Sequence, residues 1–324
     1  MISSFPPPPP ANDDFEREAS VKWPFGIFAR LSTRRLTPGL RVGRTRVVEF
    51  LGRGATACVW ALRHPEHGDC ALKVAHGAAL PFERFRREAS WLARIRSRHV
   101  PSLCGAGVLA DGAAFVAMSR APDVVLCRRT WTPQHALGLA RQALFALRDV
   151  HAAGVVHGDV KLDNLRGTHR GCQLVDFGVA CEIGRPNCLD DGAPGTLPYM
   201  APEQLRGDVL GPETDLYSLA VLLYRTLTGV FPFAASSPRV QYEDQLAAAY
   251  VPIGVVRPDA PRALDLAMRS WLCADRARRP SSADEMRHTL EDVAHRWPQD
   301  AWRRPSMPPR RREGTTRSRA VVAG

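Results

Sequence analysis

The chain has 324 residues, of which 45% are hydrophobic and 24% are charged, and its formal net charge is +11 at pH 7. This is the balance of a soluble globular protein with a sizeable core. No apolar run reaches the roughly 18 residues that a transmembrane helix needs, which argues against a membrane span. Eight cysteines are scattered without a C-x-x-C pair, a pattern typical of reduced thiols in a cytoplasmic protein.

The two ends of the chain differ in composition from its middle. Residues 1–40 include the run Pro6–Pro10, and we expect them to form a disordered leader. Eight arginines and two acidic residues between Arg296 and Gly324 carry +6 of the net charge, which predicts a disordered basic tail over 297–324. Alternatively, this tail docks an acidic partner; because it lacks interleaved aromatic residues beyond Trp302, we expect no nucleic-acid partner.

The first half of the ordered chain, predicted to begin near Arg44, has the pattern of a small sheet. Five runs show strand-like patterns: 45–51, 57–62, 70–75, 100–108 and 113–118. Residues 82–95 have helical spacing, with Phe85, Ala89 and Leu92 on one face. Five strands and one helix predict a small α+β lobe.

The second half is mostly helical. Thr132 is a good N-cap with Pro133 at the first helical position, and Gly154 can end that helix in the left-handed conformation. Three further segments have helical patterns: 213–229, 262–273 and 282–297. The sequence therefore predicts an α+β protein of two lobes, joined near residues 119–122.

The chain has only three lysines against 41 arginines. Two of the three, Lys73 and Lys161, lie in patterns where the transfer of a phosphoryl group would need a compact, mobile ammonium group. Lys73 lies in a strand pattern after Gly52 and Gly54, whose missing side chains let a backbone approach phosphate, although a hairpin explains a glycine pair equally well. A buried lysine needs an acidic partner, and Glu88 is the best candidate, with Glu83 as the alternative.

A second cluster of candidates follows the long helix. Asp159 is the candidate to orient an attacking hydroxyl, and Lys161 the candidate to neutralise the transferred group. Asn164 and Asp176 supply the hard oxygen ligands that Mg²⁺ prefers. The order H-x-D-x-K-x-x-N and then D-F-G, downstream of the glycines and Lys73, is far more specific than any of these residues alone.

Together these motifs resemble the eukaryotic-type serine/threonine protein kinase family, in its bacterial-like form, over roughly residues 44–296. The resemblance implies a five-stranded N-lobe over 44–118, a hinge over 119–122 and a C-lobe over 123–296. It also implies that ATP and Mg²⁺ bind between the lobes. The residues that it places around the nucleotide, besides those above, are Val59, Ala71, the gatekeeper Met118 and the hinge residue Ala121.

The resemblance extends beyond the catalytic residues. Glu203, in an Ala-Pro-Glu motif, matches a glutamate that pairs with the arginine represented here by Arg279. Asp215 matches the acidic anchor of the central helix in the large lobe. Lys161 and Thr196 match the serine/threonine class, which implies a protein substrate.

Two departures from the family pattern change the expected regulation and nucleotide binding. Gly158 stands where many kinases carry an arginine that grips a phosphorylated activation loop, and residues 179–195 contain no serine, threonine or tyrosine. We therefore expect an enzyme that does not depend on phosphorylation of that loop. Ala57 replaces the third glycine, and Arg166 stands where an apolar residue usually covers adenine. These substitutions leave open a pseudokinase that only binds ATP; a small-molecule kinase is the third interpretation.

Overall fold

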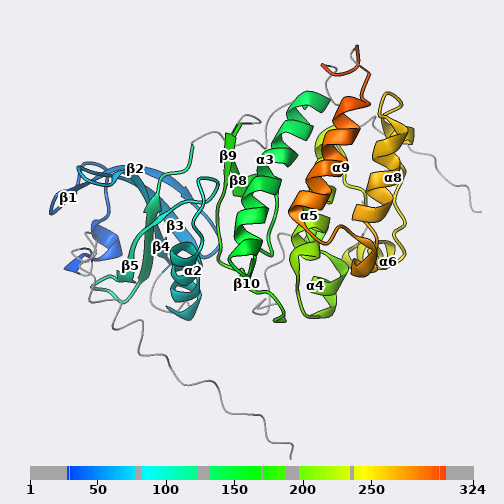
Figure 1. Ribbon diagram of the computed structural model, residues 1–324. Helices are drawn as coiled ribbons and strands as arrows, with labels where there is room; N and C mark the ends of the chain where they lie inside the picture. Colours follow the sequence, from blue (N-terminus) through cyan, green and yellow to red (C-terminus); the bar gives the residue numbers. More distant parts are fainter. Residues whose placement is uncertain are drawn as a thin grey trace, which may run out of the picture. The chain divides into compact units, whose positions relative to one another are not determined.

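The computed structural model describes residues 28, 30–76, 82–122, 131–168, 171–186, 197–233, 237–298 and 300–303 (Figure 1). The chain divides into two compact units. The first unit comprises Met1–Ala93 and Ser102–Arg120, and the second comprises Arg94–Pro101 and Ala121–Gly324. No helix within the described ranges is both long enough and apolar enough to cross a membrane.

The first unit is built on one antiparallel sheet with the strand order β1-β2-β3-β4-β6-β5. Its strands are β1 (Arg41–Val42), β2 (Thr45–Arg53), β3 (Ala57–His64), β4 (Gly68–Ala75), β5 (Leu103–Val108) and β6 (Ala114–Ser119). The five predicted strands are all present, and β1 is an addition. Gly43 has a φ of 58°, and the tight turn that it makes possible pairs Val42 with Thr45. Helix α2 (Phe82–Arg94) buries Phe85, Ala89 and Leu92, as its spacing predicted.

The first unit begins earlier than the sequence predicted. Phe28, Leu31 and Leu36 are buried in its core, and the Phe28 ring lies 6.2 Å from that of Phe115. Asp111 adds a polar contact, because its Oδ2 accepts hydrogen bonds from Thr33 N and Oγ1 at 2.7 and 2.6 Å. The prediction of a disordered leader through residue 40 is therefore wrong for the described residues from Phe28 onward. Pro6–Pro10 lie outside the described residues.

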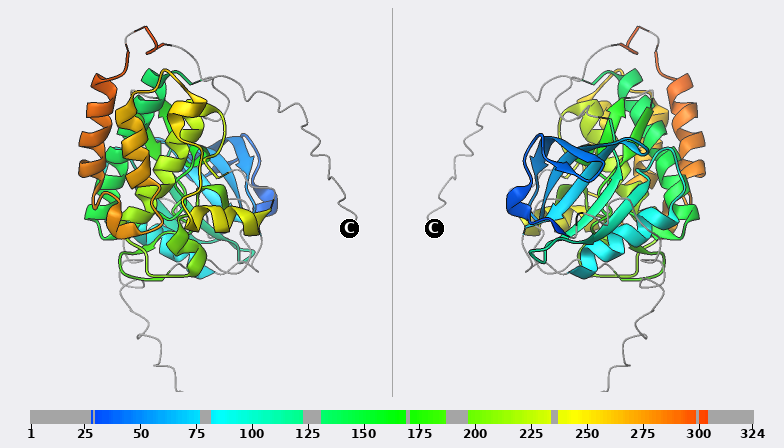
Figure 2. Two further views of the ribbon diagram at one scale, coloured as in Figure 1. Left: turned by 90° about the vertical axis from the view of Figure 1, so that its right-hand side faces the viewer. Right: turned by 90° about the vertical axis from the view of Figure 1, so that its left-hand side faces the viewer.

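The second unit is mainly helical, with α3 and α9 side by side (Figures 1 and 2). Its helices are α3 (Pro133–Ala152), α4 (Pro202–Arg206), α5 (Pro212–Thr228), α6 (Pro238–Leu246), α7 (Ile253–Val256), α8 (Arg262–Trp271) and α9 (Ala283–His295). Its short strands are β7 (Val155–Val156), β8 (Leu165–Thr168), β9 (Gly171–Leu174) and β10 (Cys181–Glu182). Helix α5 is buried from Thr214 to Tyr224, as expected for a helix that is apolar on most of its surface.

The ends of α3 agree with the sequence prediction. The Thr132 side chain accepts a hydrogen bond from His135 N, Pro133 occupies the first turn, and Gly154 follows the helix with a φ of +75°. A side-chain cap and a left-handed glycine are both local features, which explains why they could be recognised without knowledge of the tertiary contacts.

Two predicted domain boundaries need correction. Residues 94–101 belong to the second unit, where Ser97 Oγ donates to Asp149 Oδ2 at 2.5 Å and the ring of His99 stacks on Phe145. At the other end, Trp297 is 2% exposed and its ring lies 6.4 Å from that of Trp302. The basic tail expected from residue 297 therefore begins later, and its arginines from residue 304 onward lie outside the described residues.

Candidate active site

The first unit holds the predicted phosphate cradle, in the turn between β2 and β3. Gly54 N donates to Ala57 O at 2.8 Å, which closes the turn. The end of β4 supports it, because His76 N donates to Thr56 O at 3.0 Å. The sheet register places Val59 opposite Lys73. Gly52 lies within β2, opposite Val59, and Gly54 lies in the turn itself. These contacts hold both glycines on a strand framework next to the candidate lysine.

Lys73 forms the ion pair that the sequence predicted. Its Nζ lies 2.9 Å and 2.7 Å from the two carboxylate oxygens of Glu88, whose side chain is 2% exposed. The alternative partner, Glu83, instead pairs with Arg86 on the surface of α2. Because the carboxylate balances the ammonium, this strand can keep a charged lysine that is 13% exposed.

Two further candidates of the first unit face each other across the same sheet. Ala71 on β4 pairs with Met118 on β6, and Met118 is buried. Ala121 belongs to the second unit and is half-buried.

In the second unit, the loop after β7 brings three candidates together. Asn164 Nδ2 donates to the backbone oxygen of Asp159 at 2.8 Å and to its Oδ2 at 2.9 Å. Lys161 Nζ lies 2.7 Å from the same Oδ2. The other oxygen, Oδ1, is buried and has no hydrogen-bond partner among the residues that the structure describes. The carboxylate is thus held through one oxygen, while the second forms no hydrogen bond with those residues.

The same contacts fix the orientation of the Asn164 side-chain amide. Because its amide nitrogen serves two oxygens of Asp159, its own oxygen lies on the other side of the amide. Asp176 follows β9 and is linked to Asn164 through its neighbour, because Val175 N donates to Asn164 O at 2.9 Å. The backbone of Asp176 is strained, with a φ of +68°. An amide and a carboxylate oxygen are ligands that suit Mg²⁺.

Asp215, at the start of α5, holds the backbone of the loop that precedes Asp159. It is completely buried, and it accepts hydrogen bonds from His157 N at 2.9 Å and Gly158 N at 2.8 Å. His151 Nε2 lies 2.8 Å from the same carboxylate. Burial alone raises the pKa of Asp215, but the hydrogen bonds and the nearby histidines outweigh it, and the pKa is lowered. The carboxylate therefore fixes the backbone just before Asp159.

Gly158 has a backbone role that its sequence position did not reveal. Its φ is +75°, in the left-handed region, and a Cβ atom there would lie 3.4 Å from Val179 O. Gln204 Nε2 donates to the carbonyl oxygen of Gly158 at 2.8 Å. The glycine therefore does more than omit an arginine, and Gln204 is a supporting residue that the sequence analysis missed, because nothing local links positions 158 and 204.

A buried ion pair ties α4 to the loop before α9. Arg279 donates from Nη1 and Nη2 to the two oxygens of Glu203 at 2.7 and 2.9 Å. Both side chains are buried, and Thr214 Oγ1 donates to Glu203 Oε1 at 2.8 Å. The pairing predicted from the motifs is therefore present. Thr196 lies outside the described residues, and Arg166 is half-buried on β8.

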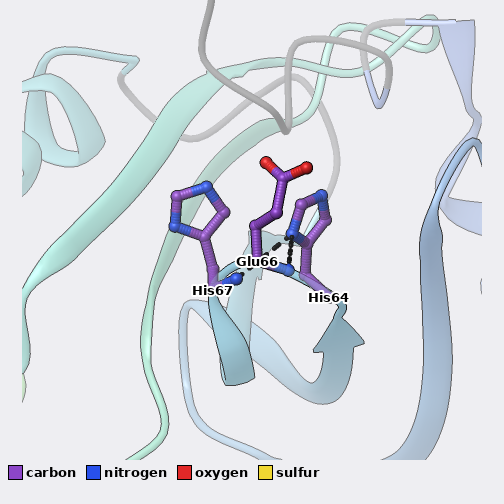
Figure 3. Close-up of side chains that lie close together, drawn as sticks. All are labelled: His64, Glu66 and His67. Atoms are coloured by element: carbon purple, nitrogen blue, oxygen red, sulfur yellow. Dashed lines mark hydrogen bonds between the residues drawn. The ribbon is translucent and has the colours of Figure 1, made fainter.

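The turn between β3 and β4 gathers two histidines and a glutamate (Figure 3). One potential ligand atom from each of His64, Glu66 and His67 lies within 4.8 Å of the others. However, His64 Nδ1 accepts hydrogen bonds from the backbone N–H groups of Glu66 and His67 at 3.2 and 3.3 Å. A neutral imidazole that accepts at Nδ1 carries its proton on Nε2. The lone pair that a metal needs is committed to the turn, and we assign no metal to this cluster.

Comparison with known proteins identifies the family. Residues 45–291 match the protein kinase domain family. The chain is 32% identical over 283 residues to serine/threonine-protein kinase pkn3 of Myxococcus xanthus. The aligned region covers 78% of this chain and 51% of pkn3. It is 31% identical over 274 residues to serine/threonine-protein kinase PknD of Mycobacterium tuberculosis, and that aligned region covers 79% of this chain and 40% of PknD.

The chain therefore belongs to the protein kinase domain family, and the resemblance seen in its motifs is confirmed. The α+β protein kinase fold is confirmed with it. The chain spans only about half or less of the length of these curated relatives.

Proposed function

We propose that this chain is a serine/threonine protein kinase that transfers the γ-phosphate of ATP to a hydroxyl group of a protein. The observation that supports this most directly is the state of Asp159. Asn164 and Lys161 hold its Oδ2, while Oδ1 is buried without a hydrogen-bond partner among the described residues. This arrangement suits a carboxylate that orients a substrate hydroxyl and accepts its proton.

The remaining residues have complementary roles in this proposal. The backbone around Gly52 and Gly54 binds the phosphates, and Lys73, kept in place by Glu88, grips them by charge. Asn164 and Asp176 would hold Mg²⁺, which would supply positive charge beside the phosphates. The Asp159 carboxylate positions the acceptor hydroxyl.

A different part of the second unit bears on the nature of the acceptor. In this family the Ala-Pro-Glu segment helps to build a peptide-docking surface, and here Arg279 ties Glu203 of that segment into the buried core. This supports a protein substrate over a small molecule. The alternative of an ATP-binding pseudokinase is favoured by one observation, the half-buried Arg166 on β8 close to the metal-binding Asn164.

Phosphorylation assays with radiolabelled ATP and Mg²⁺ test the proposal. Wild-type protein is expected to phosphorylate a generic serine/threonine peptide library. Asp159→Asn is expected to lower turnover by about 10²–10⁴-fold while nucleotide binding is retained. Asp163→Asn is the matched control, because this exposed carboxylate lies in the same loop.

Three results would contradict the proposal or redirect it. Wild-type protein that binds ATP without turnover would show a pseudokinase. Phosphorylation of sugars or antibiotics without phosphorylation of peptides would show a small-molecule kinase. Full activity of Asp159→Asn would remove the assigned base. Lys73→Met and Asp176→Ala, both expected to be inactive, extend the test to the phosphate and metal sites.

We also propose that activity does not require phosphorylation of the activation segment. Residues 179–195 offer no hydroxyl side chain, and the left-handed backbone of Gly158 suits the glycine that replaces the usual arginine. Protein treated with a phosphatase is therefore expected to keep its activity. Loss of activity after the phosphatase treatment, restored when the activation segment is phosphorylated again, would refute this.

The setting of the protein is also a proposal. All six cysteines within the described ranges are free thiols, which supports a reducing, cytoplasmic compartment. Binding of an acidic partner by the arginines beyond residue 303 rests on their charge alone, and loss of such binding on truncation at that point would test it.

A further inference from the structure

The phosphate cradle carries a cysteine–histidine pair that the proposed reaction does not use. Cys58 lies at the start of β3, and its Sγ is 3.8 Å from Nδ1 of His76, the residue that follows β4. Both residues are half-buried. For a sulfur atom, this separation is within hydrogen-bond reach.

A second contact determines which nitrogen of His76 carries the proton. Nε2 lies 2.9 Å from the carbonyl oxygen of Gly54, which can only accept a hydrogen bond. Nε2 is therefore the donor, and in the neutral ring Nδ1 is left as the acceptor that faces the thiol of Cys58. The backbone of His76 is fixed as well, because its N–H donates to Thr56 O.

The three groups form the arrangement typical of an activated nucleophile: a thiol, a base, and a third group that orients the base. We infer that Cys58 is a reactive thiol and a modification site for small disulfides of the glutathione type. Nδ1 of His76 takes the thiol proton, and the Cys58 thiolate attacks one sulfur of the disulfide. A new S–S bond forms at Cys58 and the bond within the small disulfide breaks. The departing thiolate recovers the proton, so Cys58 is oxidised and one sulfur of the reagent is reduced.

The other cysteines that the structure describes lack this combination. Of the six described cysteines, only Cys58 and Cys273 are half-buried, and the remaining four are buried. Burial raises the pKa of the Cys172 thiol to about 12, which keeps that thiol protonated. Cys273 has a similar degree of burial to Cys58, and no hydrogen bond from its thiol to a histidine is found among the described residues. It is therefore an internal control within the same molecule.

Modification of Cys58 has a consequence for the cradle, and this step rests on the proposed function. A thiol adduct on Cys58 occupies the side of His76 that faces Nδ1 and displaces the ring from Gly54 O. The turn that contains Gly54 then loses one of its supports. We expect nucleotide affinity to fall when Cys58 is modified and to recover when the mixed disulfide is reduced.

Site-resolved labelling tests the reactivity without any measurement of activity. The full-length, reduced protein is incubated with glutathione disulfide near pH 7, and the adduct on each cysteine is quantified by mass spectrometry over time. Cys58 is expected to react about tenfold faster than Cys273. His76→Gln can still donate to Gly54 O but cannot take a proton, and it is expected to lower the Cys58 rate about tenfold without changing that of Cys273.

The outcomes separate the two parts of the inference. Equal rates at Cys58 and Cys273 in the wild type would overturn the reactive thiol, and this comparison needs no variant. The reactive thiol would also be overturned if His76→Gln, folded with the wild-type melting temperature, formed the Cys58 adduct at an unchanged rate.

Binding of a fluorescent ATP analogue, measured before and after thiolation, tests the coupling. We expect an affinity loss of about tenfold that a reducing agent reverses, with Cys58→Ser insensitive to the disulfide. Selective labelling with unchanged affinity would overturn the coupling alone. Failure of the unmodified wild type to bind the analogue would instead count against the proposed function.

Discussion

Truncation of Glu203 to alanine is expected to destabilise the protein strongly, because it leaves the buried guanidinium of Arg279 without its carboxylate partner. Arg279 has five N–H donors, and each has an acceptor in the structure. Two donate to the Glu203 carboxylate, and three donate to the carbonyl oxygens of Cys273, Glu213 and Ala274. Removal of the carboxylate leaves a charged group at 0% side-chain exposure with two donors unpaired and no counter-ion.

The expected loss in free energy of unfolding is about 3–5 kcal/mol, the cost of breaking a buried pair on one side. With a urea dependence of about 3 kcal/mol per molar for a domain of this size, the unfolding midpoint falls by about 1–1.7 M. An exposed ion pair offers a matched control. Arg239 and Glu243 are 86% and 56% exposed, and Glu243→Ala is expected to cost only about 0.3–0.5 kcal/mol.

Urea unfolding followed by near-ultraviolet circular dichroism measures both variants. The double variant Glu203→Leu with Arg279→Met removes both charges, and we expect it to be more stable than Glu203→Ala, because no charge is left without a partner. A midpoint shift for Glu203→Ala as small as that of Glu243→Ala would refute the reasoning. So would a double variant whose loss equals the sum of the losses measured for Glu203→Leu and Arg279→Met singly.

Three further predictions concern other contacts. Burial disfavours the charged form of Asp111, but hydrogen bonds from Thr33 and Ser32 outweigh it and lower the pKa of Asp111 from 3.8 to about 2. The stability that the Asp111 carboxylate contributes is therefore present at neutral pH and lost as the pH falls from about 4 to about 2. Asp111→Ala should speed tryptic cleavage within residues 30–36, and an unchanged cleavage rate would contradict a stabilising contact between Asp111 and Thr33. Because the pKa of Asp215 is also lowered, acid below about pH 4 should destabilise the wild type more than Asp215→Asn when their melting temperatures are compared across pH. Gly158→Ala should cost about 1 kcal/mol in urea unfolding because its φ of +75° is strained for any residue with a Cβ, and an unaltered midpoint would disprove that strain.

Much of the candidate site could be predicted because its signals are local. Helical spacing placed Phe85, Ala89 and Leu92 on one face, and the structure buries that face and pairs Glu88 of the same helix with Lys73. The spacing from Asp159 to Asn164 is short enough for the two residues to meet within one loop. Such features depend on periodicity and on neighbouring residues, which a single sequence displays directly.

What only the tertiary structure decided are contacts between distant segments. Phe28 is buried because Phe115 offers it an apolar surface, and the orientation of the Gly158 carbonyl matches the position of Gln204. The Cys58–His76 pair exists because β3 and β4 align the two residues at one end of a hairpin. Residue types and local spacing determined the two units, the helix ends and the loop from Asp159 to Asn164. The partners of its buried groups depended on which remote surface the folded chain brings alongside, and no local pattern encodes that choice.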